Sequence, residues 1–296
     1  VVVTGAGNGL GKTHAMEFAQ RGAKLVINAL GSSPTGTGGD TLIAEQVVDE
    51  IKTKGGDAVA NTDSVEFGDR IIETAMDTYG RIDVLINNAG ILRDVSFHKM
   101  TNADWTTIQK VHLEGSFKVT HAAWPHMRSA GYGRILMTTS AAGLYGNFGQ
   151  ANYSAAKLAV LGLANTLAIE GHSKGILINT IAPAAASRLT ATVMPPQLLA
   201  ALQPELVTPL ATYLCHENNT STGQLFEVGG GCISRVRWQR SKGVSFNPIS
   251  GFSAEDVNDA WSQIQSFNDV DYPLTLMDSL APIGKNVGVD PTFEPQ

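Results

Sequence analysis

The chain has 296 residues, of which 21 are basic and 27 acidic, giving a formal net charge of −6. This balance argues against a dedicated surface for nucleic acid or an anionic membrane, because such surfaces usually need an excess of basic residues. Hydrophobic residues make up 43% of the chain, yet no apolar run approaches the roughly 18 residues of a membrane span. We therefore expect a folded chain with a large core, no membrane span and no nucleic-acid partner.

The chain begins directly with a strand-like run, Val1-Val2-Val3, and ends at Gln296 without a recognisable organellar address. We interpret it as a piece of a longer polypeptide. Cys215 and Cys232 have neither the spacing of a metal site nor that of a disulfide framework, so we expect no bound metal.

Short β-branched runs alternate with helical patterns over about 230 residues. The runs predict seven buried strands, at Val1–Thr4, Lys24–Asn28, Ala58–Thr62, Val84–Asn88, Arg134–Thr139, Ile176–Ala182 and Gln224–Val228. The helical patterns between them include Lys12–Arg21, Thr41–Lys54 and Ala151–Glu170. This alternation predicts the α/β class, with a Rossmann-type, doubly wound, seven-stranded parallel sheet and helices on both faces. Ligands on such sheets bind at the carboxyl ends of the strands.

Two segments depart from the alternation. Ser32–Gly39 is a long loop after the second strand, either a tolerated surface loop or a flap beside a ligand. After Gly231 the alternation ends, so we predict one domain over residues 1–231 and a C-terminal extension over residues 232–296. The extension carries one amphipathic helix near Ser253–Phe267, followed by an irregular tail rich in proline and glycine.

The turn after the first strand, Thr4–Gly11, carries glycines at positions 5, 7, 9 and 11 and leads into a helix. Glycines let the backbone approach a pyrophosphate, and the helix N-terminus offers free N–H groups and a positive dipole end. A tight strand-to-helix connection would also use glycine, but the position after an N-terminal strand favours a nucleotide site. A second turn, Asn87–Gly90, closes the fourth strand and is by itself only a turn signal.

Ser140, Tyr153 and Lys157 are the strongest candidate catalytic residues. Ser140 ends the fifth predicted strand, and Tyr153 and Lys157 lie on one face of the next predicted helix. A lysine ammonium near a phenol favours the phenolate and lowers its pKa, so that the tyrosine can exchange a proton with an alcohol or ketone. The serine hydroxyl can hold the same substrate oxygen. An ordinary pair on a surface helix would show the same spacing, but the combination with the glycine turn favours catalysis.

Together these motifs resemble the short-chain dehydrogenases/reductases, which use NAD or NADP, and the resemblance covers Val1 to about Gly231. Longer stretches are similar to the dehydrogenase unit of peroxisomal multifunctional enzymes of type 2, namely Gly90–Asp94, Val111–Leu113, Gly143–Lys157, Gly223–Gly231 and Arg237–Arg240.

The resemblance implies a role for each motif. Tyr153 would be the acid/base, Lys157 would hold the ribose and tune Tyr153, and Ser140 would orient the reacting oxygen. Gly5, Asn8, Gly9 and Leu10 would line the pyrophosphate, Asp63 and Ser64 the adenine, and Asn88, Ala89 and Gly90 the nicotinamide ribose.

It further implies that residues 1–231 are an NAD(P)-binding domain that oxidises (3R)-3-hydroxyacyl-CoA to 3-ketoacyl-CoA in peroxisomal β-oxidation. The same resemblance implies a homodimer and fusion to a 2-enoyl-CoA hydratase in the full polypeptide. Two alternatives stay open from the residues alone. One is a dehydrogenase or reductase of the same fold that acts on a steroid, a polyketide or another secondary alcohol. The other is a non-catalytic nucleotide-binding assembly module, which the intact Ser140, Tyr153 and Lys157 argue against.

Three positions depart from the wider family pattern. His112 replaces an asparagine and could relay a proton through water or brace its helix. Pro183-Ala184 replaces Pro-Gly beside the nicotinamide. Ala29 replaces an aspartate whose carboxylate would hold the adenosine 2′-hydroxyl and repel a 2′-phosphate. We therefore expect NAD as cofactor, with weakened binding and measurable use of NADP.

Overall fold

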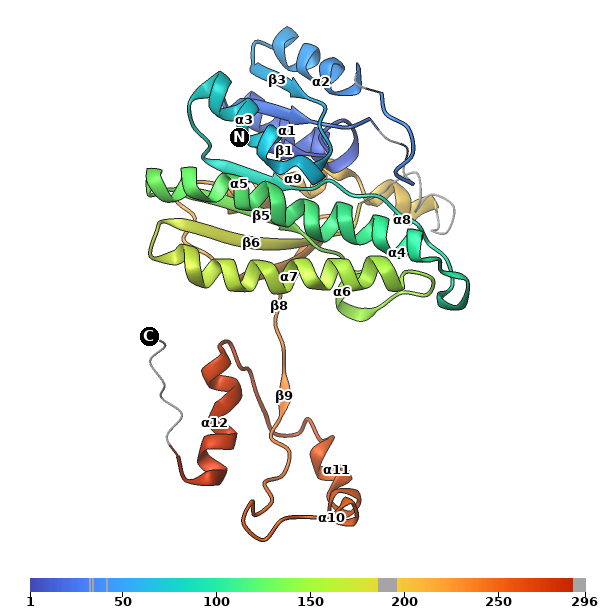
Figure 1. The fold of residues 1–296 in the computed structure, drawn as a ribbon, viewed down its shortest axis with the longest axis vertical. Helices are drawn as coiled ribbons and strands as arrows, with labels where there is room; N and C mark the ends of the chain where they lie inside the picture. Colours follow the sequence, from blue (N-terminus) through green and yellow to red (C-terminus); the bar gives the residue numbers. More distant parts are fainter. Residues whose placement is uncertain (32, 34, 41, 186–195, 290–296) are drawn as a thin grey trace. The chain divides into compact units, whose positions relative to one another are not determined.

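The computed structural model describes residues 1–31, 33, 35–40, 42–185 and 196–289. The chain divides into two compact units, Val1–Arg235 and Val236–Gln296. The first unit holds the sheet and the helices that pack on it (Figure 1).

The central sheet has eight strands in the order β3-β2-β1-β4-β5-β6-β7-β8. Its strands are β1 Val2–Thr4, β2 Lys24–Asn28, β3 Asp57–Asn61, β4 Val84–Asn87, β5 Gly133–Thr138, β6 Ile176–Pro183, β7 Gln224–Gly229 and β8 Cys232–Val236. The pairs from β3 through β7 are parallel, which confirms the predicted seven-stranded parallel sheet. The strand β8, which was not predicted, lies at the edge beside β7 and carries the sheet beyond Gly231.

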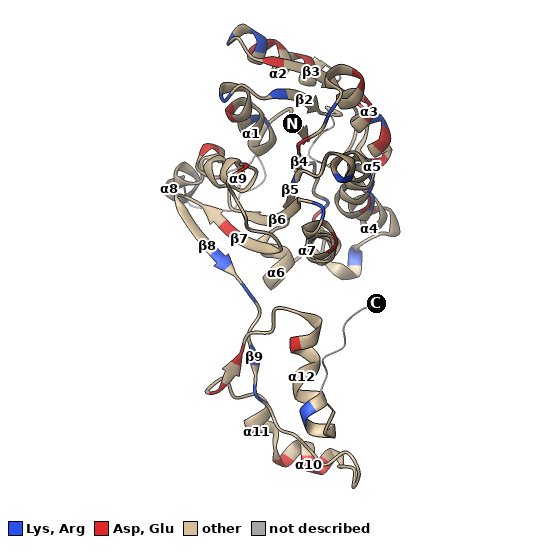
Figure 2. Ribbon diagram, turned by 90° about the vertical axis from the view of Figure 1, so that its left-hand side faces the viewer, with Lys and Arg blue, Asp and Glu red and all other residues tan. Residues whose placement is uncertain are grey.

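Helices cover both faces of this sheet (Figure 2). Their bounds are α1 Gly9–Gln20, α2 Leu42–Thr53, α3 Gly68–Tyr79, α4 Asn102–Gln109, α5 Gly115–Ala130, α6 Ala141–Tyr145, α7 Ala151–His172, α8 Pro196–Ala201 and α9 Thr208–Leu214. The shorter helices are the 3₁₀ helices η1 Val65–Phe67, η2 Phe97–Lys99 and η5 Pro204–Leu206, and the π-helix η3 Lys110–Glu114. One apolar core joins the sheet to α1, α2 and α9, and a second joins it to α3, α5 and α7.

The strand order reverses between β1 and β4, so the turns after these two strands open away from each other at the same edge of the sheet. This switch point is where ligands bind in open α/β sheets, because the connections leave a crevice there. The glycine turn and the Asn87–Gly90 turn both lie at this edge, since they follow β1 and β4.

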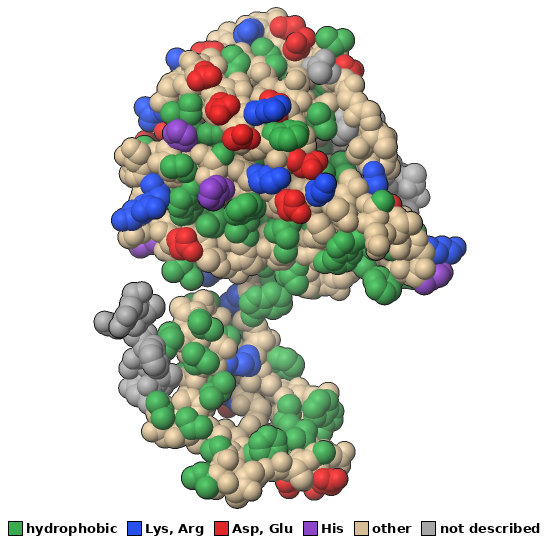
Figure 3. Space-filling model, in the orientation of Figure 1, with side chains coloured by type: hydrophobic (Ala, Val, Ile, Leu, Met, Phe, Trp, Pro, Cys, Tyr) green, Lys and Arg blue, Asp and Glu red, His purple; other side chains and the backbone are tan. Residues whose placement is uncertain are grey.

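The second unit contains the paired strands β9 Arg240–Ser241 and β10 Val270–Asp271, and the helices α10 Ala254–Asp259, α11 Trp261–Ile264 and α12 Leu276–Val287. Many large apolar side chains of this unit are exposed, and hydrophobic groups are visible on the face shown in Figure 3. The single helix predicted near Ser253–Phe267 was wrong in detail, because Ala260 separates two short helices.

The tail predicted as irregular contains the helix α12, although Pro282 lies inside it. Proline has no N–H for the carbonyl four residues earlier, which here belongs to Asp278. The Arg240 guanidinium donates to that carbonyl at 3.0 Å and to the Ser279 carbonyl at 3.2 Å. A capping box between Thr275 and Asp278 starts the helix. The prediction failed because the compensating donor comes from a distant part of the sequence.

Candidate active site

The glycine turn and the turn after β4 are joined by hydrogen bonds. The Thr4 hydroxyl accepts from the backbone N–H groups of Asn88 at 3.0 Å and Ala89 at 3.1 Å. In return, the Asn88 amide donates to the carbonyls of Thr4 at 3.1 Å and Gly5 at 3.2 Å. A Cβ on Gly5 would lie 2.7 Å from the Cα of Ala89, so only glycine allows this approach. These contacts therefore hold the two turns in a fixed position relative to each other.

The backbone at Gly9 leaves room for a ligand. Gly9 has a φ of +50°, and a Cβ built there would meet nothing within 4 Å. Asn8 precedes the helix α1 in an extended conformation, and its side chain makes no capping hydrogen bond. The first N–H groups of α1 are thus available to an anion, where the helix dipole adds to the attraction. This geometry fits the pyrophosphate of a dinucleotide.

A cavity of about 1130 Å³ opens at this edge of the sheet. All predicted cofactor residues line it, namely Gly5, Asn8, Gly9, Leu10, Asp63, Ser64, Asn88, Ala89, Gly90, Tyr153 and Lys157. His112, Thr138 and Thr139 also line it. Among the lining residues that the structure describes, the charged side chains are Asp63, Glu66 and Lys157.

The helix α7 places Tyr153 and Lys157 one turn apart at the inner end of the cavity. Lys157 is buried, and its Nζ donates to the Thr138 carbonyl at 2.7 Å and lies 5.7 Å from the centre of the Tyr153 ring. The Thr139 hydroxyl donates to the Lys157 carbonyl at 2.5 Å. Sequence reasoning missed both threonines, although their place at the end of β5 beside Ser140 was an available signal.

Burial is the largest cause of the pKa shifts of both Tyr153 and Lys157. It lowers the pKa of Lys157 to about 7 and raises the pKa of Tyr153, against a side-chain hydrogen bond with Ser140 that favours the phenolate. The net shift of the Tyr153 pKa is therefore upward, opposite in direction to the lowering that the sequence predicted. The largest cause is burial, which disfavours the charged form of each group, and the Lys157 Nζ donates to the Thr138 carbonyl.

Ser140 was predicted to end the fifth strand, but β5 ends at Thr138, and Ser140 caps the helix α6 by accepting from the Ala142 N–H at 3.2 Å. The helix α6 packs against α7, and the Ser140 side chain acts to lower the pKa of Tyr153, against the larger effect of burial. The three predicted catalytic residues thus come from the N-cap of α6 and from the neighbouring helix α7.

His112 lies in the π-helical η3, where one extra residue per turn is typical of functional sites. Its Nε2 lies 3.1 Å from the Ile91 backbone nitrogen and 2.8 Å from the Ile91 carbonyl oxygen. Its ring meets the Tyr153 ring edge-on, with centres 5.1 Å apart. A Cβ on Gly90 would lie 2.6 Å from the His112 Cε1. Burial, together with the Lys157 charge, lowers the pKa of His112 to about 3, so the ring is neutral.

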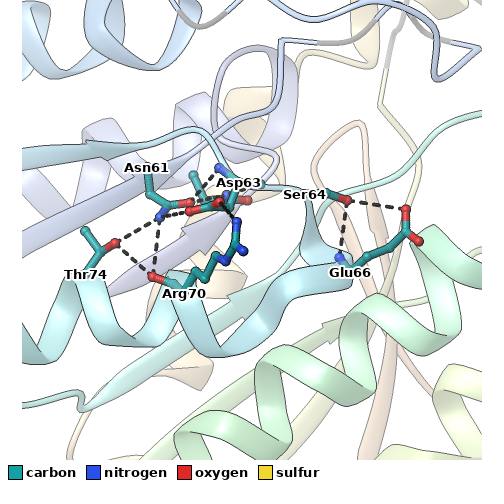
Figure 4. Close-up of polar contacts among 7 residues, drawn as sticks. Asn61, Asp63, Ser64, Glu66, Arg70 and Thr74 are labelled. Atoms are coloured by element: carbon teal, nitrogen blue, oxygen red, sulfur yellow. Dashed lines mark hydrogen bonds and ion pairs between the residues drawn. The ribbon is translucent and has the colours of Figure 1, made fainter.

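The far end of the cavity, after β2 and β3, is built from amides. The Asn61 Nδ2 donates to Asp63 Oδ2 at 3.0 Å and to the Thr74 hydroxyl at 2.9 Å, and its Oδ1 accepts from the Asp63 N–H at 3.1 Å (Figure 4). The Asn28 Nδ2 donates to Asn61 Oδ1 and to the Asp63 carbonyl, both at 2.8 Å. Arg70 lies 3.5 Å from the Asp63 carboxylate. The family resemblance indicated Asp63, but sequence reasoning missed its three partners Asn28, Asn61 and Arg70.

Ala29 lines this end of the cavity and is buried. Its N–H donates to the Asn61 carbonyl at 3.0 Å, so the backbone at the end of β2 is regular and only the carboxylate is missing. Ser64 lies opposite, at the start of η1, where its hydroxyl accepts from the Glu66 N–H at 3.3 Å.

The described part of the loop after β2 lies beside the cavity, which supports the flap interpretation of Ser32–Gly39. Ser33 and Gly36 line the cavity, and a Cβ on Gly36 would lie 2.7 Å from Ile91 Cδ1. The Arg93 Nε donates to the Thr35 carbonyl at 3.0 Å. Residues 32 and 34 of this loop lie outside the described residues. Near the nicotinamide-side departure, Pro183 and Ala185 line the cavity, and the Ala184 N–H donates to the Val228 carbonyl at 2.8 Å.

In the described parts of the chain, no helix is both long and apolar enough to cross a membrane. Within the same residues, no group of three or more histidine, cysteine or acidic side chains could hold a metal ion.

The model of the short chain dehydrogenase family matches residues 1–196. The chain belongs to this family. It is 56% identical over 283 residues to peroxisomal multifunctional enzyme A of Dictyostelium discoideum, covering 96% of this chain and 64% of that protein. It is 54% identical to peroxisomal multifunctional enzyme type 2 of Mus musculus, covering 94% of this chain but 38% of that protein. This short-chain dehydrogenase thus spans between about a third and two thirds of the multifunctional proteins it matches.

Two solved structures agree with this assignment. The full-length peroxisomal multifunctional enzyme type 2 of Drosophila melanogaster has a TM-score of 0.83 and 39% identity, covering 97% of this chain and 49% of that one. A 7α-hydroxysteroid dehydrogenase complexed with NADH and 7-oxo glycochenodeoxycholic acid has a TM-score of 0.69 and 29% identity, covering 78% of this chain and 92% of that one.

Proposed function

We propose that this chain is a dehydrogenase unit that oxidises (3R)-3-hydroxyacyl-CoA to 3-ketoacyl-CoA with a nicotinamide cofactor, as part of peroxisomal β-oxidation. The observation that carries the proposal is the placement of Tyr153 and Lys157 in the cavity that also holds the glycine turn, with Ser140 at the N-cap of the neighbouring helix α6. The similarity to peroxisomal multifunctional enzymes supports the acyl-CoA substrate. Residues 1–231 would form the NAD(P)-binding domain and residues 232–296 an extension of it.

The cofactor, when bound, supplies the acceptor for the hydride. Gly5, Asn8, Gly9 and Leu10 would hold its pyrophosphate through backbone N–H groups at the open start of α1. Asp63 and Ser64 would hold the adenine, and Asn88, Ala89 and Gly90 would hold the nicotinamide ribose. Lys157 would donate to hydroxyl groups of that ribose.

The chain's own residues would handle the proton. Ser140 would donate a hydrogen bond to the substrate oxygen and hold it against Tyr153. The Tyr153 oxygen would take the hydroxyl proton as the carbonyl forms, and Lys157 in its charged form would stabilise the phenolate. Because burial raises the pKa of Tyr153 and lowers that of Lys157, the charged Lys157 and the phenolate stabilise each other and are best formed together.

His112 would position the site rather than carry protons. Its ring contacts Gly90 and Ile91 beside the nicotinamide ribose position and also the edge of Tyr153, so it spaces the cofactor from the acid/base. In the described structure the His112 Nε2 lies against the Ile91 backbone, and no protein group hydrogen-bonds to the buried Nδ1. His112→Phe keeps the ring contacts and should leave the pH profile unchanged. A relay instead predicts a shifted pH profile and a changed solvent isotope effect.

The substrate assignment is tested by comparing turnover of (3R)-3-hydroxyacyl-CoA, its (3S) isomer and the corresponding alcohol without CoA. We expect turnover of the (3R) thioester alone. Equal turnover of a steroid or a free secondary alcohol would replace the substrate class while keeping the chemistry. No turnover of any alcohol, with NADH still bound, would indicate a non-catalytic nucleotide-binding module.

The assembly proposal is a homodimer formed through α5 and α7, within a peroxisomal polypeptide that also carries a 2-enoyl-CoA hydratase. The helix α7 buries Val160 and Leu161 but leaves Leu158 41% and Ile169 77% exposed, and Phe117 on α5 is also exposed. These exposed apolar groups support a partner on this face. Sedimentation that shows only a 31.3 kDa species at micromolar concentration would remove the proposal.

A further inference from the structure

A chain of four hydrogen-bonding groups links α1 to α9 outside the proposed catalytic residues. His14 is buried, and its Nδ1 lies 2.8 Å from the Thr208 hydroxyl. The Thr208 hydroxyl lies 3.1 Å from that of Thr13, which lies 2.9 Å from the Leu10 carbonyl oxygen. Leu10 belongs to the first turn of α1 and lines the cavity.

Only one arrangement of protons satisfies every hydrogen bond in this series of four groups. The Leu10 carbonyl can only accept, so the Thr13 hydroxyl must donate to it. The Thr13 oxygen must then accept from Thr208, which leaves the Thr208 oxygen to accept from His14. His14 must therefore be protonated at Nδ1. The other ring nitrogen, Nε2, then carries a lone pair, and it is buried without a hydrogen-bond partner in the described structure.

The two ends of this hydrogen-bond series lie beside different parts of the fold. At one end, Leu10 follows Gly9, whose open backbone faces the cavity. At the other end, Thr208 begins α9 directly after η5, and α1 packs against both of these elements. The chain therefore braces the first turn of the glycine-turn helix against the region that follows β6. Apolar packing alone would leave this turn free to slide, whereas directed hydrogen bonds specify its position.

We propose that Thr13, His14 and Thr208 are positioning residues that hold the first turn of α1 in the geometry that binds the cofactor pyrophosphate. The proposal rests on the proposed use of a nicotinamide cofactor. Each of the three acts through the backbone of α1 and not by touching the cofactor. The hydrogen bond to Thr208 places the single N–H of His14 at Nδ1, and burial lowers the pKa of His14 to about 4, so the ring is neutral near pH 7.

The test uses the complete chain and NADH as the probe. Thr208→Val keeps the shape of the side chain but removes the hydroxyl that joins His14 to Thr13. Thr208→Ser is the matched control, because it retains the hydroxyl. We expect Thr208→Val to weaken NADH binding about 3- to 10-fold. Its kcat at saturating cofactor should stay within about twofold of the unchanged chain, since Ser140, Tyr153 and Lys157 are untouched. Thr208→Ser should bind NADH like the unchanged chain.

A second measurement does not depend on the cofactor. Nitrogen-15 NMR of the labelled histidines should show His14 as the Nδ1–H tautomer, without titration between pH 8 and about pH 5. An Nε2–H tautomer would overturn the deduced direction of the chain. NADH affinity in Thr208→Val equal to that in Thr208→Ser would overturn the positioning role, even if the variant unfolds at a lower temperature. Failure of the unchanged chain to bind NADH would overturn the proposed function instead, while the tautomer still tests the hydrogen-bond chain.

Discussion

The two ends of the cavity are built on different physical principles. At the proposed catalytic end, which holds Tyr153 and Lys157, burial shifts the pKa of both ionisable groups, and each would perform a role that no neighbour duplicates. At the adenosine end, formed by Ala29, Asp63 and Ser64, neutral amides share their hydrogen bonds in a network. Loss of one atom should therefore be severe at the catalytic end and moderate at the adenosine end.

The largest effect should come from Tyr153→Phe, which deletes only the proposed acid/base oxygen. We expect kcat to fall by roughly 10²–10⁴, which is the usual value of general acid/base help. The Phe ring can keep the edge contact with His112, so NADH affinity should change less than about twofold. Steady-state kinetics beside an NADH titration would check both values. Near-normal turnover would contradict the mechanism.

Lys157 should show a conflict between activity and stability. Lys157→Ala should weaken NADH binding and lower kcat by roughly 10²-fold, because one ammonium serves the ribose and Tyr153. Lys157→Met fills the same space without a charge, and it should raise the unfolding free energy at pH 7 by about 1–3 kcal/mol.

The pH dependence of this gain has a definite sign. Burial lowers the folded-state pKa of Lys157 to about 7, so between pH 7 and the unfolded value of 10.5 the unfolded chain binds the extra proton. Stability of the unchanged chain should rise with pH across that window, and the advantage of Lys157→Met should shrink. Denaturant unfolding at several pH values would measure it. An advantage that grows with pH would contradict the assigned burial.

Ala29→Asp should increase the preference for NAD⁺ over NADP⁺ at the proposed adenosine end. A hydrogen bond to a charged acceptor is worth about 1.5–3 kcal/mol, so NAD⁺ affinity should rise roughly 10- to 150-fold and NADP⁺ use should disappear. Ala29→Asn is the matched control, since it offers a hydrogen bond without the negative charge. Kinetics of the three proteins with both cofactors would test this. An unchanged chain that already excludes NADP⁺ a thousandfold would show that Asp63 and Glu66, the carboxylates at this end, suffice.

The smallest effect should follow from Asn61→Ala. This change removes the amide that holds Asp63 and accepts from Asn28, so NADH affinity should fall about 3- to 10-fold. Thr74→Val removes only one partner of Asn61 and should have less than half that effect on the binding free energy. Isothermal titration with NADH would rank the two variants. A loss of NADH affinity of roughly 100-fold or more, as large as the loss of kcat expected for Tyr153→Phe, would show that the ends do not differ in the way described.

Sequence alone determined the features that local spacing controls. The sheet, the glycine turn and the approach of Tyr153 to Lys157 follow from periodicity, from glycine's conformational freedom and from the pitch of one helix. The candidate cofactor residues came from the resemblance to short-chain dehydrogenases, and they line one cavity because parallel strands bring their carboxyl ends to one edge.

Only the tertiary structure decided the features that depend on burial and on contacts between distant segments. The pKa of Tyr153 rises because the fold removes it from water, an effect that the Tyr-x-x-x-Lys spacing does not contain. The contact of His112 with Ile91, the link from His14 to Thr208 and the support of α12 by Arg240 each join residues far apart in the sequence. Such pairs leave no periodic trace, so their energetics become visible only when the chain is folded.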